Sequence, residues 1–175
     1  TINYQFDAGL GKVKLRAESS LFPILLDEIE KIRNYEYLCN EQLASKLKAL
    51  LLEKSVRKYL GETFKEEKNI KEILKKLQNS KRPEGTWGWW QNSSEELWIS
   101  LHVVEALIDA QKQGYKVELD RDKLYRYLLS KMAQEKGFDQ VYGIRLLRIL
   151  DEKYYINDWI NAVEKKRAEL EERNR

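Results

Sequence analysis

The only cysteine of the chain lies three residues before a glutamine, in the stretch EYLCNEQLAS at residues 36–45. Side chains three residues apart share one face of a helical turn, so the Cys39 sulfur and the Gln42 amide can meet. Attack of that sulfur on the side-chain carbonyl carbon would release ammonia and leave a cyclic thioester. A thioester is a stored acylating group, and it needs a dry cover because water destroys it. The plainer alternative is a small buried cysteine at the start of a helix.

Most of the tryptophans are gathered in one loop and the first residues of the helix that follows it. Large aromatic side chains usually complete a hydrophobic core, and this structural role is the one that the sequence favours. The same group could instead shield a thioester or stack on a sugar ring. The four tryptophans concerned are Trp87, Trp89, Trp90 and Trp98.

Other residues that often carry chemistry have structural interpretations here. The single histidine, His102, falls inside a predicted helix, and we interpret it as a packing residue. Asp120 and Asp122 flank Arg121 at a helix start, which predicts a cap instead of a metal site. The sequence contains no zinc-ligand spacing, phosphate-binding loop or nucleophile–base motif. It therefore predicts no metal and no cofactor.

The elements that position these residues are predicted to be helices after residue 18. Apolar residues at helical spacing, with capping and terminating residues between them, define seven segments. Short connections predict antiparallel neighbours, in a bundle or a ring of helical hairpins. The first segment is capped by Ser20 and has Pro23 in its first turn, the second covers 40–60 and is ended by Gly61, and the third is capped by Asn69. The fourth runs from Ser94 to Gly114, the fifth runs from the Asp120 cap to about Gly137, the sixth covers 139–151, and the seventh is capped by Asn157.

The first 18 residues differ, because apolar and polar residues alternate on both sides of a glycine-containing turn at 7–11. This pattern predicts a β-hairpin over 1–18, joined to a helical domain over 19–175. The chain has 42% hydrophobic and 35% charged residues with a net charge of +3, a globular profile with interleaved charges and no argument for nucleic acid. No apolar stretch approaches the roughly 20 residues of a membrane span. The chain starts at Thr1 and its only methionine is Met132, so we expect a processed protein or a piece of a longer one.

Residues 39–42, Cys-Asn-Glu-Gln, resemble the Cys-x-Glu-Gln thioester motif of the alpha-2-macroglobulin and complement proteins. The surrounding stretch NYEYLCNEQLASKLKALLLEK is similar to the bacterial macroglobulin version. Downstream, GTWGWWQNSSEELWISLHVVEALIDAQKQGY is similar to the tryptophan loop of that family and the helix after it. The likeness covers about residues 20–115. Glu36 and Leu38 depart from it, because they stand where the family usually has proline and glycine.

The resemblance implies a mainly α fold, a partial α/α toroid that contains about half of the family's helical hairpins. It implies the thioester domain of a bacterial alpha-2-macroglobulin-like protein of the periplasm or cell envelope, an endopeptidase inhibitor instead of an enzyme. Bait cleavage would expose the thioester, which acylates a lysine of the attacking protease. Cys39 would be the leaving thiolate and Gln42 the acyl donor, with Glu41, Trp87, Trp89 and Trp90 as supporting residues.

Two other functions stay open on the sequence. One is a non-covalent helical interaction module whose thioester motif has decayed. The other is a carbohydrate-binding or carbohydrate-active toroid, suggested by the tryptophans but without an obvious pair of placed carboxylates. If the thioester forms, the lack of histidine in the loop from Gly85 to Ser94 predicts that amines are acylated in preference to hydroxyls.

Overall fold

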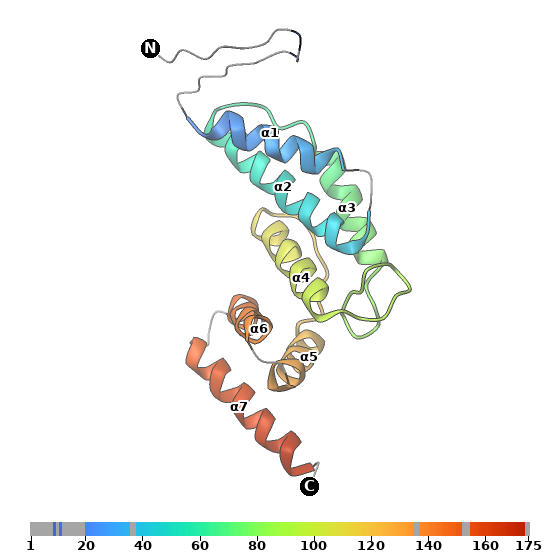
Figure 1. The fold of residues 1–175 in the computed structure, drawn as a ribbon, viewed down its shortest axis with the longest axis vertical. Helices are drawn as coiled ribbons and strands as arrows, with labels where there is room; N and C mark the ends of the chain where they lie inside the picture. The colour runs from blue at the N-terminus through green and yellow to red at the C-terminus, as the bar shows by residue number, and fades with distance from the viewer. Residues whose placement is uncertain are drawn as a thin grey trace.

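The structure, a computed structural model, describes residues 9, 11, 20–35, 38–134, 137–151 and 155–173. These residues form helices and connecting segments, and none of them lies in a strand, so the prediction of a mainly helical chain is confirmed. The hairpin predicted over 1–18 lies outside the described residues, apart from Gly9 and Gly11. The helices are α1 (Phe22–Arg33), α2 (Asn40–Tyr59), α3 (Glu67–Asn79), α4 (Leu97–Lys112), α5 (Arg121–Gln134), α6 (Phe138–Leu150) and α7 (Ile156–Arg173) (Figure 1).

Several predicted helix boundaries are confirmed by the backbone. Gly61 and Gly114 follow α2 and α4 with φ of +71° and +88°, in the left-handed region that glycine reaches at low cost. Gly137, near which α5 was predicted to end, is the N-cap residue of α6 (φ 72°, ψ −139°). Asp120 caps α5, since its carboxylate accepts a hydrogen bond from the N–H of Lys123 at 3.1 Å. Pro23 lies in the first turn of α1, where its missing N–H costs little.

Four predicted caps are wrong. Ser20 does not cap α1, whose N-cap residue is Leu21 and makes no side-chain capping bond. Asn69 lies inside α3, and its amide donates to the Glu66 carboxylate before the helix. Asn157 lies inside α7, whose start is instead closed by a bond from the N–H of Tyr155 to the Asp158 carboxylate. Ser94 does not begin α4, which starts at Leu97.

The late start of α4 has a long-range cause. The N–H of Glu96 donates to the carbonyl of Trp87 at 3.0 Å, and Glu96 has an extended backbone (φ −128°, ψ 125°). This bond ties the chain before α4 back to the tryptophan loop, so the helix cannot begin at Ser94. Sequence signals for caps miss such a bond, because its partner lies nine residues away.

The core is centred on the packing of α2 against α4. Helices α1 and α3 flank α2, and α4 also contacts α6, which leads to the α5–α7 group at the other end of the molecule (Figure 1). Leucines of α2 and α4 that are completely buried form the centre, namely Leu47, Leu50, Leu101 and Leu107. Burial of one such side chain is worth about 1.5–3 kcal/mol, so this interface fixes the position of the first turn of α2. Closure of the helices into a toroid stays a prediction.

Candidate functional site

The first turn of α2 holds Cys39 and Gln42 together. Cys39 is the N-cap residue, with an extended backbone (φ −68°, ψ 165°) and its side chain facing the N–H of Gln42. In return, the N–H of Cys39 donates to Oε1 of Gln42 at 3.2 Å. This reciprocal capping box satisfies N–H groups that the start of a helix leaves without partners. It also places the predicted sulfur nucleophile and the predicted acyl group over the same turn.

The surroundings of Cys39 are dry, and the backbone before it is relaxed. Cys39 is 4% exposed. Leu38, at the position where the resembling family usually has glycine, does not need glycine's freedom: among the described residues, only glycines have a positive φ. A leucine before the cysteine is therefore compatible with this turn. Glu36, the other departure, lies outside the described residues.

Asn40 connects the turn to two other segments, a role that the sequence analysis missed. Its backbone N–H donates to the carbonyl of Trp89 at 2.9 Å, and its side-chain amide donates to the carbonyl of Gly88 at 2.9 Å. Its Oδ1 accepts from the hydroxyl of Ser80, at the end of α3, at 2.7 Å. Asn40 is 2% exposed, so these bonds supply the hydrogen-bond partners that its buried amide needs. They also fix the first turn of α2 on the tryptophan loop.

The tryptophan loop is itself fixed by Trp87. This side chain is fully buried, and its indole N–H donates to the carbonyl of Leu77 at 2.8 Å. The Ser100 hydroxyl lies 2.9 Å from both the N–H and the carbonyl of Trp87. Gly88 follows, and a Cβ there would lie 1.8 Å from the carbonyl oxygen of Ser94. Only glycine fits at this close approach, so Trp87 and Gly88 build the loop that receives Asn40.

Trp89 and Trp90 lie on the surface instead. They are 42% and 56% exposed, and the Trp89 ring meets the Trp98 ring edge-on, with centroids 5.2 Å apart. Both line a groove of about 340 Å³ together with Leu38, Asn40 and the end of α3. Gln42 is not among the residues that line it. The structure thus separates the tryptophans predicted as one supporting group into one core residue and two groove residues.

Glu41 and Gln42 line a different cavity, of about 250 Å³, between the end of α1 and the first turns of α2. Its other walls are Ile32, Tyr35, Ser45 and Lys46. The hydroxyl of Ser45 donates to Oε1 of Glu41 at 2.9 Å. The Glu41 carboxylate is thereby held by Ser45, and all three residues Glu41, Gln42 and Ser45 line this cavity.

His102 on α4 supports this arrangement from behind. Its Nε2 lies 2.9 Å from the Ser45 hydroxyl, and its Nδ1 lies 3.3 Å from Nζ of Lys48. Burial and the nearby charge of Lys48 lower the pKa of His102 below its ordinary value of 6.5, so the ring is neutral at pH 7. An ammonium group only donates, so Nδ1 accepts from Lys48 and Nε2 carries the proton. The chain of donors therefore runs from Lys48 through His102 and Ser45 to Glu41.

The hydrogen bonds of His102 give it a wider role than the packing role predicted from the sequence. Because α4 begins at Leu97 and not at Ser94, His102 lies within the second turn of its helix. It is hydrogen-bonded to α2 one turn after Gln42, and is more than a packing residue. One hydrogen bond joins its ring to Ser45, which itself lines the cavity.

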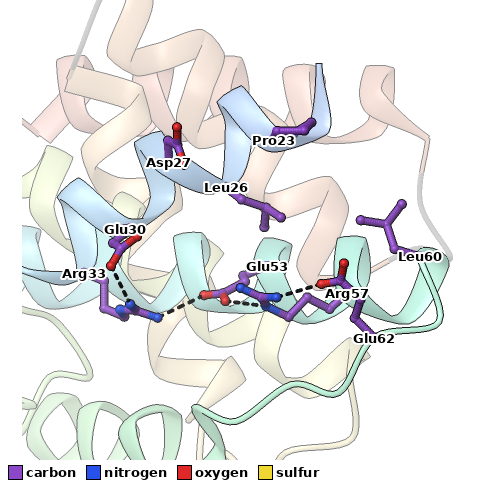
Figure 2. Close-up of a pocket in the computed structure, with 9 residues that line it drawn as sticks. All are labelled: Pro23, Leu26, Asp27, Glu30, Arg33, Glu53, Arg57, Leu60 and Glu62. Atoms are coloured by element: carbon purple, nitrogen blue, oxygen red, sulfur yellow. Dashed lines mark hydrogen bonds and ion pairs between the residues drawn. The ribbon is translucent and has the colours of Figure 1, made fainter. Parts of the chain in front are cut away.

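A second cavity beside α2, of about 360 Å³, is ionic (Figure 2). Its centre is Glu53, which is 3% exposed and accepts a hydrogen bond from Nε of Arg57 at 2.6 Å. Arg33 of α1 approaches the other Glu53 oxygen at 3.8 Å and also pairs with Glu30, and Arg57 pairs with Glu62. This cluster fastens the end of α1 to α2, because two cations of neighbouring segments share one buried carboxylate.

The described part of the chain offers neither a metal site nor a membrane span. No group of three His, Cys, Asp or Glu residues there is placed to hold a metal ion. None of the helices α1–α7 is both long and apolar enough to cross a membrane.

Comparisons with known proteins point in one direction. No family model matches the chain. It is 25% identical to alpha-2-macroglobulin of Thermotoga maritima and 29% identical to alpha-2-macroglobulin of Escherichia coli, over 59% and 57% of this chain respectively. The matched region is 7% of the length of each relative, so the chain corresponds to a small part of those proteins.

Solved structures agree. A crystal structure of native E. coli alpha-2-macroglobulin, spanning domain MG7 to the C-terminus, matches with a TM-score of 0.57 and 25% identity, over 73% of this chain and 23% of that one. A cryo-EM reconstruction of the native E. coli protein matches in fold with a TM-score of 0.60 and 24% identity, over 82% of this chain and 10% of that one. The resemblance predicted from the sequence is confirmed: this chain is similar to part of a bacterial alpha-2-macroglobulin.

Proposed function

We propose that this segment, similar as it is to part of a bacterial alpha-2-macroglobulin, carries an internal thioester between Sγ of Cys39 and the side-chain carbonyl carbon of Gln42. The observation that carries the proposal is the reciprocal capping box, in which the N–H of Cys39 donates to Oε1 of Gln42 at 3.2 Å. The Gln42 amide carbonyl stands here for the acyl carbonyl of the thioester. An attacking sulfur therefore meets a carbonyl that already accepts a backbone hydrogen bond.

Formation of the bond balances without a co-reactant. The Cys39 sulfur forms a bond with the carbonyl carbon, the C–N bond of the amide breaks, and the nitrogen leaves as ammonia after taking the thiol proton. Negative charge develops on Oε1 during this step, and the N–H of Cys39 is positioned to stabilise it. The 4% exposure of Cys39 restricts water at the sulfur.

The acyl group is then available to a nucleophile, and we propose that the physiological acceptor is a lysine amine of an attacking protease. The protein would act once per molecule, as an endopeptidase inhibitor instead of an enzyme, together with other domains of its parent chain. This assignment, and a location in the bacterial periplasm or cell envelope, rest on the similarity to bacterial alpha-2-macroglobulins. The proposed closure of the domain into a toroid rests on the same similarity.

The intact mass of the unreduced protein tests the proposal. A thioester makes the protein lighter by one ammonia, and methylamine then adds to Gln42 and releases one titratable thiol. The Cys39→Ala variant is the control, because it keeps the amide and shows no deficit. A thiol that titrates fully before amine treatment, without a mass deficit, would argue for a non-covalent interaction module with a decayed motif.

The groove lined by Trp89 and Trp90 is the observation that favours this second candidate. Two half-exposed indole rings beside the amides of Asn79 and Gln91 form a surface suited to stacking and hydrogen bonding. Loss of ligand or protein binding in Trp90→Ala, in a protein without the mass deficit, would support this role.

A further inference from the structure

The cavity beside Gln42 contains a carboxylate that the thioester bond itself does not use. Glu41 lines this cavity together with Gln42, whereas the tryptophan groove on the other side of the turn is not lined by Gln42. A nucleophile that enters this cavity from the side of Ile32 and Tyr35 therefore meets two adjacent residues of the first turn of α2, Glu41 and Gln42.

Attack by an amine creates a proton that must leave. A neutral amine that adds to a thioester carbonyl yields an adduct with a positively charged nitrogen and a negatively charged oxygen. If that nitrogen keeps its extra proton, the amine is expelled again more readily than the thiolate. A base in contact with the nitrogen makes the forward step productive.

We propose that Glu41 is this base, and that amines reach the thioester through the cavity between α1 and the first turns of α2. The inference rests on the thioester proposed above. The amine nitrogen bonds to the Gln42 carbonyl carbon and transfers one proton to the Glu41 carboxylate. The C–S bond then breaks, its electron pair leaves on Sγ of Cys39, and Glu41 passes the proton to that thiolate, so that an amide and a thiol result.

The structure holds Glu41 in place for this task. Ser45 donates to its Oε1 at 2.9 Å, and the Ser45 hydroxyl is in turn fixed by His102 at 2.9 Å. His102 is thus a positioning residue, since its ring does not line the cavity. Lys46 is the other charged residue of the cavity wall, and as an ammonium group it cannot accept the proton.

Two nucleophiles separate base catalysis from structural damage. Methylamine must lose a proton during attack, whereas the thiolate of 2-mercaptoethanol has none to lose. In the intact protein, Glu41→Gln is expected to lower the rate constant for methylamine on the order of 100-fold, the lower end of general base catalysis. The thiolate rate does not fall, because removal of a negative charge from the cavity favours an anion. Both rates are followed by the mass of the whole protein.

The control is Glu28→Gln, the same substitution at an exposed α1 carboxylate that pairs with Lys31. Glu28 lines neither the cavity of Gln42 nor the tryptophan groove. It should leave both rates unchanged. If the amine and thiolate rates of Glu41→Gln fall together, or if neither falls, the inference is overturned while the thioester stands. If the wild-type protein shows no mass deficit, the thioester proposal itself fails.

If Glu41→Gln prevents the thioester from forming, the mass of that variant shows no deficit. A second variant then keeps the test decisive. Ser45→Ala retains the base but removes the hydroxyl that orients it. We expect a smaller fall in the methylamine rate alone. Unchanged amine reactivity in Ser45→Ala, with the mass deficit intact, would contradict a role for the oriented carboxylate.

Discussion

At the N-terminal end of α2, Glu41 is partly exposed, accepts one hydrogen bond from Ser45 and faces a cavity beside Gln42. About three turns further along, Glu53 is 3% exposed and lies between Arg33 and Arg57. Both glutamates lie beside α1, and both line a cavity. One carboxylate is compensated by two cations of the protein, and the other is compensated by a single hydroxyl.

This difference separates a structural role from a chemical one. A carboxylate that is buried between two arginines stays paired with them, because loss of either ion pair leaves a buried charge without compensation. A carboxylate with one neutral partner and an open side can receive a proton or a cation from outside. The ionic cluster holds the end of α1 in place (Figure 2), and so fixes Ile32, a wall of the cavity beside Gln42.

The largest effect on stability is expected at the buried carboxylate, Glu53. Glu53→Ala should lower the free energy of unfolding by about 3 kcal/mol, the lower bound for breaking a buried ion pair, because both arginines keep other carboxylates nearby. Glu41→Ala should cost no more than about 1 kcal/mol, the value of a carboxylate in the first turn of a helix. Urea denaturation of the two variants measures this, and equal losses would abolish the distinction between the two ends.

A second, smaller loss is expected at Asn40, the buried polar residue of the N-terminal end. Asn40→Ala removes the bonds to the Gly88 carbonyl and the Ser80 hydroxyl, and should destabilise the fold by about 2 kcal/mol. It should also loosen the tryptophan loop, so that Trp fluorescence and methylamine reactivity change together. The control Asn79→Ala changes an amide in the neighbouring groove. An effect confined to stability would show that the loop does not position the turn.

The smallest effect concerns pH. The folded-state pKa of His102 is lowered by burial and by Lys48, so the unfolded chain binds a proton first as pH falls below about 6.5. The neutral ring's contribution to stability is present above that pH and is lost as pH falls further. The stability of the wild type relative to His102→Gln should therefore decrease between pH 7 and pH 5, as measured by urea denaturation at both pH values. A difference that stays constant with pH would contradict the lowered pKa of His102 in the folded state.

Much of the local structure could be predicted from the sequence. Glycines that end α2 and α4 and the aspartate that caps α5 act through their own backbone conformation or a partner three residues away. The spacing of Cys39 and Gln42 likewise belongs to one turn, and the two residues indeed share a capping box. The start of α4 was mispredicted because the bond that decides it joins Glu96 to Trp87.

The sequence by itself determined the helices, the resemblance and the pair of side chains that could form a thioester, because each depends on neighbours within one or two turns. Only the tertiary structure decided that Trp87 is buried while Trp89 and Trp90 are exposed, since the direction of each indole depends on how the loop meets α3 and α4. It also decided that Glu41 faces the cavity of Gln42 while Glu53 is enclosed by arginines. A glutamate in a helix has the same local signal at both positions, and its surroundings come from segments distant in the chain.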